Sequence, residues 1–252
     1  MDNYQFCVDW ALNQRITPST RILDYGCGAG HIVKALRARN VDAFGCDVFY
    51  EGGDYSKLVE SEYLGKSIKR MEPDGRIPYD DETFDFVINN QVMEHVTDLD
   101  KVLSEIHRVL KPGGKVLSLF PDKSVWREGH CGIPFLHWFP KGSRPRIYYA
   151  ALMRLLGFGY HKENKTIMRW SADFCEWLDK WTWYRPSKDI RRSYQKYFTN
   201  ENELEGYWLS KRLDKLGSIS ELVPLGARKL VVRKLGGRIF VVEKGALNNQ
   251  SA

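Results

Sequence analysis

One short stretch near the N-terminus constrains the fold of this chain more than any other. Residues 21–25 (RILDY) have the composition of a buried strand, residues 26–30 (GCGAG) place three glycines at alternate positions, and residues 31–39 have the apolar spacing of a helix. Only glycine leaves the backbone open where it turns sharply and approaches a ligand. The stretch therefore predicts the first unit of an α/β fold, with a ligand at the glycine turn.

The alternation of strands and helices continues to about residue 121. A leading helix is expected at residues 3–14, and a third helix at residues 98–110 should end at the breakers of residues 111–114 (KPGG). Four more strands are expected, at residues 41–46, 67–71, 84–88 and 115–120. Such an order predicts an α/β, Rossmann-like fold with a mostly parallel sheet and helices on both faces.

The pattern changes after residue 121. Residues 122–200 hold six of the eight tryptophans and show no clear strand–helix alternation, so we expect an aromatic-rich insertion after the fifth strand. This insertion is either a cap that forms a substrate pocket or the core of a small subdomain. Residues 201–245 should return to the core, and residues 246–252 should form a frayed tail. Expected in this last part are a helix at 203–216, a short segment at 218–223, a basic helix at 225–235 and a strand at 238–242.

Composition places the chain among globular proteins, with 43% hydrophobic and 28% charged residues. No apolar run approaches the roughly 20 residues of a membrane span, and the first residues lack a basic region followed by an apolar one, so we expect an unexported, cytoplasmic protein. The five cysteines are scattered without a C-x-x-C pair. This spacing argues against a disulfide framework and against a zinc site.

Charge is divided unevenly along the chain. Residues 1–121 carry 14 basic and 19 acidic residues, net −5, whereas residues 122–252 carry 24 and 13, net +11. A basic second half suggests an acidic partner, such as a phosphate-bearing substrate, a nucleic acid or an anionic membrane surface. The alternative is a solvated basic face without a partner.

The spacing of the glycine turn indicates which ligand it serves. Dinucleotide-binding folds favour G-x-G-x-x-G, with the start of the helix facing a pyrophosphate, whereas this turn is G-x-G-x-G preceded by an acid, so the ligand need not carry phosphate. Asp47 follows Gly26 by 21 residues and ends the second strand, where an acid binds the hydroxyls of a ribose. A nucleoside ligand is therefore expected. The alternative is a purely structural connection between strand and helix.

Four blocks of sequence resemble the class I methyltransferases, and more closely those with a methyltransferase type 11 domain. The blocks are residues 22–30 (ILDYGCGAG), 44–47 (FGCD), 77–96 (IPYDDETFDFVI to EHV) and 105–114 (EIHRVLKPGG). The resemblance covers roughly residues 20 to 121 and implies a Rossmann-like fold with S-adenosylmethionine as cofactor. It does not imply a particular substrate. Residues 1–121 would then be the cofactor-binding core.

The resemblance assigns cofactor roles to residues of the first two strands. The backbone of Gly26 and Gly28 would line the methionine and ribose part of the cofactor. Asp24 would orient its amino group, and Asp47 would hold its ribose.

Two further cofactor contacts follow from the same resemblance. Asn90 or Gln91, at the end of the fourth strand, would approach the sulfonium. After the third strand the family often has an acid followed by a small residue beside the adenine, whereas this chain has MEPD at residues 71–74. Glu72 is the residue we assign to the adenine side.

Methyl transfer requires the acceptor atom to be held about 3 Å from the methyl carbon, in line with the leaving sulfur. A hydroxyl acceptor also benefits from a base, for which His130 and His137, just beyond the fifth strand, are the candidates. Either could instead be a packed loop residue. His95 and His107 rank lower, because the first belongs to a family motif that is often structural and the second lies on an amphipathic helix. Cys131 is expected to be a structural thiol.

The sequence thus favours an S-adenosylmethionine-dependent methyltransferase acting on an oxygen, or second on a nitrogen, of a small-molecule, glycan or lipid-linked acceptor that could be anionic. The rival is an RNA methyltransferase or nucleic-acid-binding protein that uses the basic half. No RNA-binding module is recognisable, and no N-P-P-Y-like motif follows the fourth strand. A third interpretation is peripheral contact with a membrane surface, through the basic and apolar residues at 225–235 and 135–139.

Overall fold

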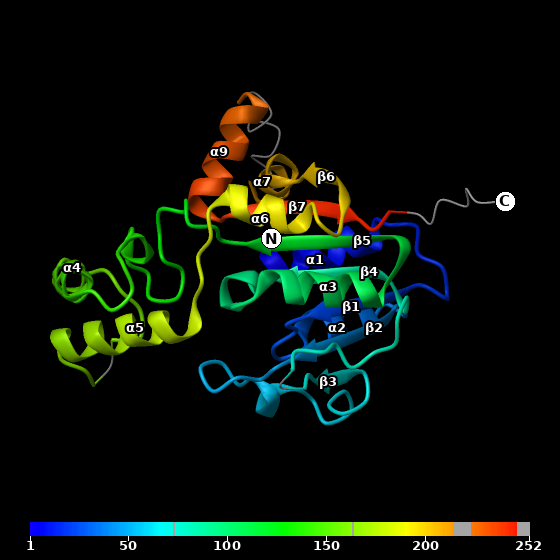
Figure 1. Ribbon diagram of the computed structural model, residues 1–252, viewed down its shortest axis with the longest axis horizontal. Helices are drawn as coiled ribbons and strands as arrows, with labels where there is room; N and C mark the ends of the chain where they lie inside the picture. The colour runs from blue at the N-terminus through cyan, green and yellow to red at the C-terminus, as the bar shows by residue number, and fades with distance from the viewer. Residues whose placement is uncertain (73, 163, 214–222, 246–252) are drawn as a thin grey trace.

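The computed structural model describes residues 1–72, 74–162, 164–213 and 223–245 (Figure 1). Within these residues seven strands form one sheet in the order β3-β2-β1-β4-β5-β7-β6. The strands are β1 (Arg21–Tyr25), β2 (Asp42–Asp47), β3 (Ile68–Arg70), β4 (Phe84–Asn90), β5 (Leu110–Phe120), β6 (Thr199–Glu203) and β7 (Arg238–Glu243). Strands β1 to β5 run parallel, and β7 is antiparallel to both of its neighbours. The mostly parallel sheet predicted from the sequence is confirmed.

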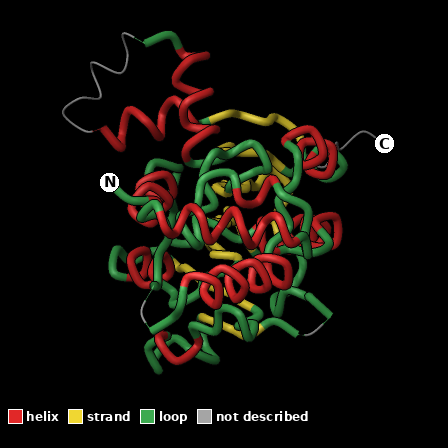
Figure 2. Tube along the Cα trace, turned by 90° about the vertical axis from the view of Figure 1, so that its left-hand side faces the viewer, coloured by secondary structure: helices red, strands yellow, loops and turns green. Residues whose placement is uncertain are grey.

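Helices cover both faces of this sheet. The helices are α1 (Asn3–Leu12), α2 (His31–Arg37), α3 (Leu99–Val109), α4 (Arg144–Leu155), α5 (Ile167–Trp181), α6 (Ser187–Tyr194), α7 (Glu205–Leu213) and α9 (Leu225–Leu235). One face packs against α1, α2, α7 and α9, and the other against α3 and α6. Figures 1 and 2 show the resulting layers, with α4 and α5 beside the sheet rather than over it.

The two faces of the sheet follow from the alternation of side chains along each strand. Ile22 and Ile88 point into the cluster beneath α1 and α2, whereas Leu23 and Val87 point into the cluster beneath α3. All four side chains are fully buried. A strand that is apolar on both faces needs helices on both sides, which is why β1 and β4 lie at the centre of the sheet.

The aromatic-rich segment has a hydrophobic core of its own. Its buried residues come from three places, the loop after β5, helix α4 and helix α5, and they are Cys131, Ile133, Leu136, Ala150, Trp170, Cys175 and Leu178. We call residues 122–184 the cap. Helix α6 follows the cap, and its Ile190 and Tyr194 pack with α3 in the cluster of the main sheet.

Some elements differ from the sequence expectation. The predicted strand at 115–120 begins earlier, at Leu110, which pairs with Phe84 before the register shifts across the glycines. Strand β6 was not predicted, because its residues (TNENE) carry no apolar signal, and it forms the polar edge of the sheet beside β7.

The C-terminal helices lie close to the predicted positions. Helix α7 starts at Glu205, two residues after its predicted start, and α9 and β7 occur where a helix and a strand were expected. The last residues of the predicted helix at 203–216, most of the segment at 218–223 and the tail at 246–252 lie outside the described residues. All five cysteines are free and buried. Across the part of the chain that the structure describes, no helix has the length and apolar character needed to cross a bilayer.

Candidate active site

The glycine turn lies at the carboxyl end of β1, at the edge of the sheet where ligands of open α/β folds bind. Gly26, Gly28 and Gly30 all have positive φ, at 72°, 51° and 78°. A Cβ on Gly26 would lie 2.5 Å from a methyl group of Val92. The positive φ therefore disfavours any residue with a side chain at these three positions, and at Gly26 the contact with Val92 disfavours it further.

Asp47 ends β2 directly beside this turn. Its Oδ2 accepts a hydrogen bond from the backbone N–H of Gly28 at 2.9 Å, and its Oδ1 accepts one from the N–H of Phe49 at 2.7 Å. Burial raises the pKa of Asp47, and these two N–H donors oppose that effect. A carboxylate has about four acceptor positions, so Asp47 can still accept from two ribose hydroxyls.

Asp24, on β1, is a buried acid. Its side chain is 4% exposed, and it makes no hydrogen bond or ion pair with the described residues. Burial, and then the charge of Asp47, hold the pKa of Asp24 well above its usual range. A ligand cation would reverse this effect, because an opposite charge favours the carboxylate. The ammonium and sulfonium of S-adenosylmethionine are cations of this kind, so the residues fit the cofactor.

The other residues assigned to the cofactor lie at the same edge of the sheet. Asn90 ends β4, and its buried Oδ1 has no hydrogen-bond partner among the described residues. Gln91 follows with a left-handed backbone, φ 59°, and its N–H donates to the Leu119 carbonyl. Glu72 is exposed just after β3, next to Met71, whose N–H donates to the Asp47 carbonyl.

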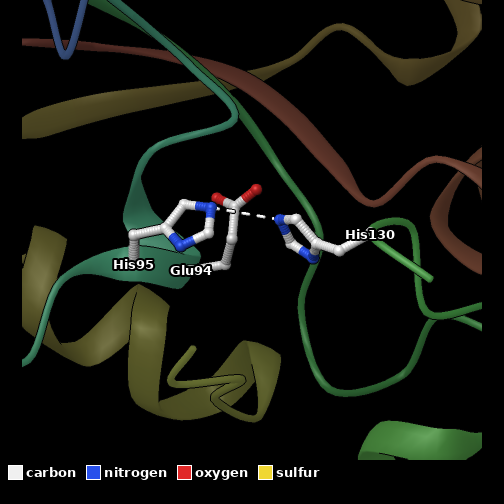
Figure 3. Close-up of side chains that lie close together, drawn as sticks. All are labelled: Glu94, His95 and His130. Carbon is white, nitrogen blue, oxygen red and sulfur yellow. Dashed lines mark hydrogen bonds between the residues drawn. The ribbon is translucent and has the colours of Figure 1, made fainter. Parts of the chain in front are cut away.

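A chain of hydrogen bonds joins the loop after β4 to the loop after β5. Nδ1 of His130 lies 2.6 Å from Oε1 of Glu128, and Nε2 of His130 lies 3.1 Å from Nε2 of His95. Nδ1 of His95 in turn lies 2.7 Å from the carbonyl oxygen of Trp181. Figure 3 shows the rings of His95 and His130 facing one another across the gap between their loops.

These contacts fix where the protons are. A carbonyl oxygen only accepts, so Nδ1 of His95 carries a proton; because burial lowers the pKa of His95 to about 4, the ring is neutral and its Nε2 has a lone pair. The Nε2 of His130 must then be the donor between the two rings. Because the Glu128 carboxylate also accepts, His130 donates from both nitrogens and is an imidazolium in this arrangement.

The pKa shifts agree with this assignment. Burial disfavours the charged form of His130, but the hydrogen bond and charge of Glu128 outweigh it and raise its pKa above the ordinary value. Burial alone would raise the pKa of Glu128, but the hydrogen bonds from His130 and the other donors lower it to about 2. Burial and the charge of His130 lower the pKa of His95 to about 4.

Glu128 is held by several donors at once. Besides His130, the hydroxyl of Tyr184 donates to its Oε1 at 2.7 Å, and the N–H of Cys131 donates to its Oε2 at 2.7 Å. The carboxylate is fully buried. Such a buried, fully bonded carboxylate fixes the orientation of the His130 ring.

Glu94, His95 and His130 bring ligand atoms within 4.8 Å of one another, a spacing that a metal ion could bridge. As an imidazolium His130 donates from both nitrogens, and loss of one proton frees a lone pair on its Nε2. Burial raises the pKa of the Glu94 carboxyl to about 7, and its Oε2 has no partner among the described residues.

His137, the other candidate base, lies away from His95. It belongs to the short helix η3 (Leu136–Trp138), is buried, and its ring centroid is 4.5 Å from that of Tyr184. Burial lowers its pKa to about 4. The structure thus brings His130, but not His137, into hydrogen-bond contact with the loop after β4.

Sequence reasoning did not single out Glu128 or Tyr184, and it ranked His95 low. Glu128 precedes His130 by only two residues, but the segment is a turn in which the N–H of Gly132 donates to the Glu128 carbonyl oxygen, so no periodic pattern marked the pair. Tyr184 is 56 residues from Glu128 in the chain. Only the folding of the cap brings it there.

The sheet order, the glycine turn and the acid at the end of β2 together define a Rossmann-like fold built for S-adenosylmethionine, the fold of the class I methyltransferases. Residues 23–118 match a family described as a methyltransferase domain. This stretch is under half of the chain, and through it the chain contains a methyltransferase domain.

Curated relatives are similar to about half of the chain. A ubiquinone biosynthesis O-methyltransferase of Chelativorans sp. is 30% identical over 143 residues, which cover 53% of each chain. A ubiquinone/menaquinone biosynthesis C-methyltransferase of Geotalea daltonii is 33% identical over 110 residues, 42% of this chain and 47% of that one. The chain thus spans about half the length of these relatives.

Solved structures share the fold at low identity. An S-adenosylmethionine-dependent methyltransferase from Mesorhizobium loti superposes with a TM-score of 0.52 at 14% identity, covering 96% of this chain and 100% of that one. A phosphoethanolamine N-methyltransferase from Haemonchus contortus gives 0.51 at 14% identity, covering 96% and 52%. The named relatives and neighbours differ in the atom they methylate, so the likeness leaves the acceptor open.

Replacing Asp47 with alanine is expected to weaken binding of S-adenosylhomocysteine by about 1 to 3 kcal/mol, because charge-assisted hydrogen bonds to the ribose are lost. Calorimetry measures this directly. Asp42→Ala, at the other end of the same strand, is the matched control and should bind normally. Equal affinity of Asp47→Ala and the wild type would show that Asp47 does not hold the ribose.

Proposed function

We propose that the protein transfers the methyl group of S-adenosylmethionine to a hydroxyl oxygen of a small-molecule, glycan or lipid-linked acceptor. The observation that carries this proposal is the hydrogen-bonded chain from Glu128 through His130 to His95 at the carboxyl edge of the sheet. Hydroxyl oxygens are poor nucleophiles while protonated, and a positioned histidine is the usual base for removing that proton.

In this proposal the acceptor oxygen attacks the methyl carbon, the bond between that carbon and the sulfonium sulfur breaks, and the hydroxyl proton moves to Nε2 of His130. The products are the methyl ether and S-adenosylhomocysteine, whose sulfur keeps the bonding electrons. Asp24 and Asp47 hold the donor, and Glu128 stabilises the imidazolium that forms.

The two facing histidines suit a hydroxyl ligand. When His130 loses its extra proton, its Nε2 lone pair faces the lone pair of His95 across a contact that is 3.1 Å in the protonated state. Two acceptor nitrogens repel one another, so the rings separate and can admit an O–H group between them. An incoming hydroxyl is a donor of this kind.

A screen with methyl-labelled S-adenosylmethionine tests the proposal. The panel should contain hydroxylated metabolites, glycans, lipid-linked saccharides, amines and RNA, with unlabelled competitor as the blank. The expected result is label in an ether that resists the hydrolysis that removes methyl esters. Label confined to RNA or to an amine would overturn the proposal and favour the nucleic-acid or nitrogen alternatives.

Trp138 tests whether the cap selects the acceptor. Its side chain is 46% exposed and far in sequence from the glycine turn. Trp138→Ala is expected to raise the KM for the acceptor about 5- to 30-fold, the equivalent of about 1 to 2 kcal/mol of lost apolar contact. Affinity for S-adenosylhomocysteine should not change.

Trp126→Ala is the matched control, since Trp126 is a similarly exposed tryptophan of the cap. If Trp138→Ala instead lost cofactor affinity while its circular dichroism spectrum stayed normal, the division of labour between core and cap would be wrong.

A further inference from the structure

A cavity of about 440 Å³ lies between the loop after β5, the start of α4 and the segment that follows α5. We call it the basic cap pocket. Its lining includes four cationic and several aromatic side chains, among them Lys123, Lys141, Arg146, Arg185, Trp138 and Tyr184. None of the described residues that line it is acidic. A pocket of this size can hold part of a metabolite-sized ligand.

The pocket has more cationic side chains than carboxylates that pair with them among the described residues. Asp179 pairs with Arg146 and accepts from the N–H of Gly142. Lys123 makes no ion pair within the described ranges, and Lys141 donates to the Asp179 carbonyl oxygen at 2.8 Å rather than to a carboxylate. Among the described residues Arg185 likewise donates only to backbone carbonyls.

The pKa of Lys141 reflects both its burial and the cations near it. Burial lowers its pKa, and the charges of Arg146 and Arg185 lower it further against the opposing effect of Asp179. Its Nζ also lies 4.5 Å from the centre of the Trp183 ring. A cation held among other cations and against an aromatic face is stabilised by an incoming anion.

One buried donor on the wall is unsatisfied among the described residues. Arg146 is 2% exposed, and its Nε has no hydrogen-bond partner there. A buried donor without a partner is costly, so this N–H is available to a ligand.

Tyr184 connects this pocket to the proposed base. Its ring lines the pocket, while its hydroxyl donates to Oε1 of Glu128, the oxygen that also contacts His130. A ligand seated in the pocket therefore lies one side chain away from the Glu128–His130 pair. This placement suits the non-reacting end of an acceptor.

We propose that the basic cap pocket binds a phosphoryl group of the acceptor, so that the enzyme methylates a phosphate- or diphosphate-bearing molecule. Three cations remain after Arg146 is paired with Asp179. One carboxylate would neutralise only one of them, whereas a phosphate monoester carries about 1.5 to 2 negative charges at neutral pH and a diphosphate more. This inference rests on the proposed function for its link to methyl transfer, but not for the binding itself.

Calorimetry on the full chain, saturated with S-adenosylhomocysteine, tests the binding. Pyrophosphate, inorganic phosphate and succinate are titrated separately at one fixed ionic strength. Pyrophosphate should bind most tightly. The double variant Lys123→Gln/Lys141→Gln should weaken its binding by about tenfold or more, because two charge-assisted contacts are lost.

The matched control is Lys66→Gln/Lys188→Gln, which removes the same charge from exposed lysines outside the pocket. It should bind pyrophosphate like the wild type. Equal losses in both double variants, succinate binding as tightly as pyrophosphate, or no binding at all would each overturn the phosphoryl assignment.

A paired activity assay separates this inference from the proposed function. An acceptor that is labelled in the screen is compared with its dephosphorylated form. The expected result is a KM at least tenfold higher without the phosphate, and a similar rise in the Lys123→Gln/Lys141→Gln variant. If the wild type and the double variant methylated a neutral acceptor equally well, the phosphoryl inference would be wrong and O-methylation would stand. If pyrophosphate bound but no ether product formed, O-methylation would be wrong and the phosphoryl site would stand.

Discussion

His130→Ala is expected to lower turnover by about 10²- to 10⁴-fold, the usual contribution of a positioned general base. Cofactor affinity should not change, because the residues assigned to the cofactor lie on β1 to β4 or directly after them, and none lies in the loop after β5 that holds His130. Initial rates at saturating cofactor measure the first effect, and calorimetry with S-adenosylhomocysteine measures the second. Full activity in the variant would leave positioning of the acceptor as the whole mechanism.

The control is His161→Asn, which removes an exposed histidine of the cap. Asparagine is chosen because His161 has a positive φ of 52°, a conformation that alanine adopts poorly. This variant should keep wild-type turnover.

The pH dependence of the rate tests the same hypothesis. A base acts only when deprotonated, so the rate should rise with pH through the pKa of His130. Since Glu128 raises that pKa, the rising limb should lie above the ordinary histidine value of about 6.5. Glu128→Gln removes the charge that stabilises the imidazolium, so the limb should move to lower pH, and it should vanish in His130→Ala. A limb that stays in place in Glu128→Gln would belong to another group.

The core of the fold could be predicted because each of its elements carries a local signal. The glycine turn at residues 26–30 and the acid at the end of β2 have fixed spacings, and the strands β1 and β4 are continuous apolar runs that need cover on both faces. The polar strand β6 has no such signal. It is specified by pairing with β7, which is a long-range contact.

The candidate site could be predicted only in part for the same reason. His130 stood out as a histidine just beyond the fifth strand, but its partners come from three separate segments. Glu128 is near in sequence, His95 lies on the preceding loop, and Tyr184 follows α5. The basic cap pocket is also built by folding, since Lys123 and Arg185 are far apart in the chain.

Trp170→Ala is expected to destabilise the cap by about 3 to 5 kcal/mol, the usual cost of deleting a large buried aromatic side chain. Trp170 is fully buried at the centre of the cap cluster, and its Nε1 donates to the Tyr160 carbonyl at 2.9 Å. The ring also packs on Phe174, at 4.8 Å between centroids. Hydrogen exchange measures the loss locally, as faster exchange of the amides of α4 and α5.

The cap cluster shares no buried residue with the two clusters of the sheet, so the loss should remain local. Amides of α3 should keep their protection, and S-adenosylhomocysteine should bind as before, while turnover falls because the acceptor pocket loses its support. Tyr148→Ala, an exposed aromatic on α4, is the control and should change stability by no more than about 0.5 kcal/mol. Equal loss of protection in α3 and α5 would mean that cap and sheet unfold as one unit. Destabilising the cap would then also destabilise the cofactor site.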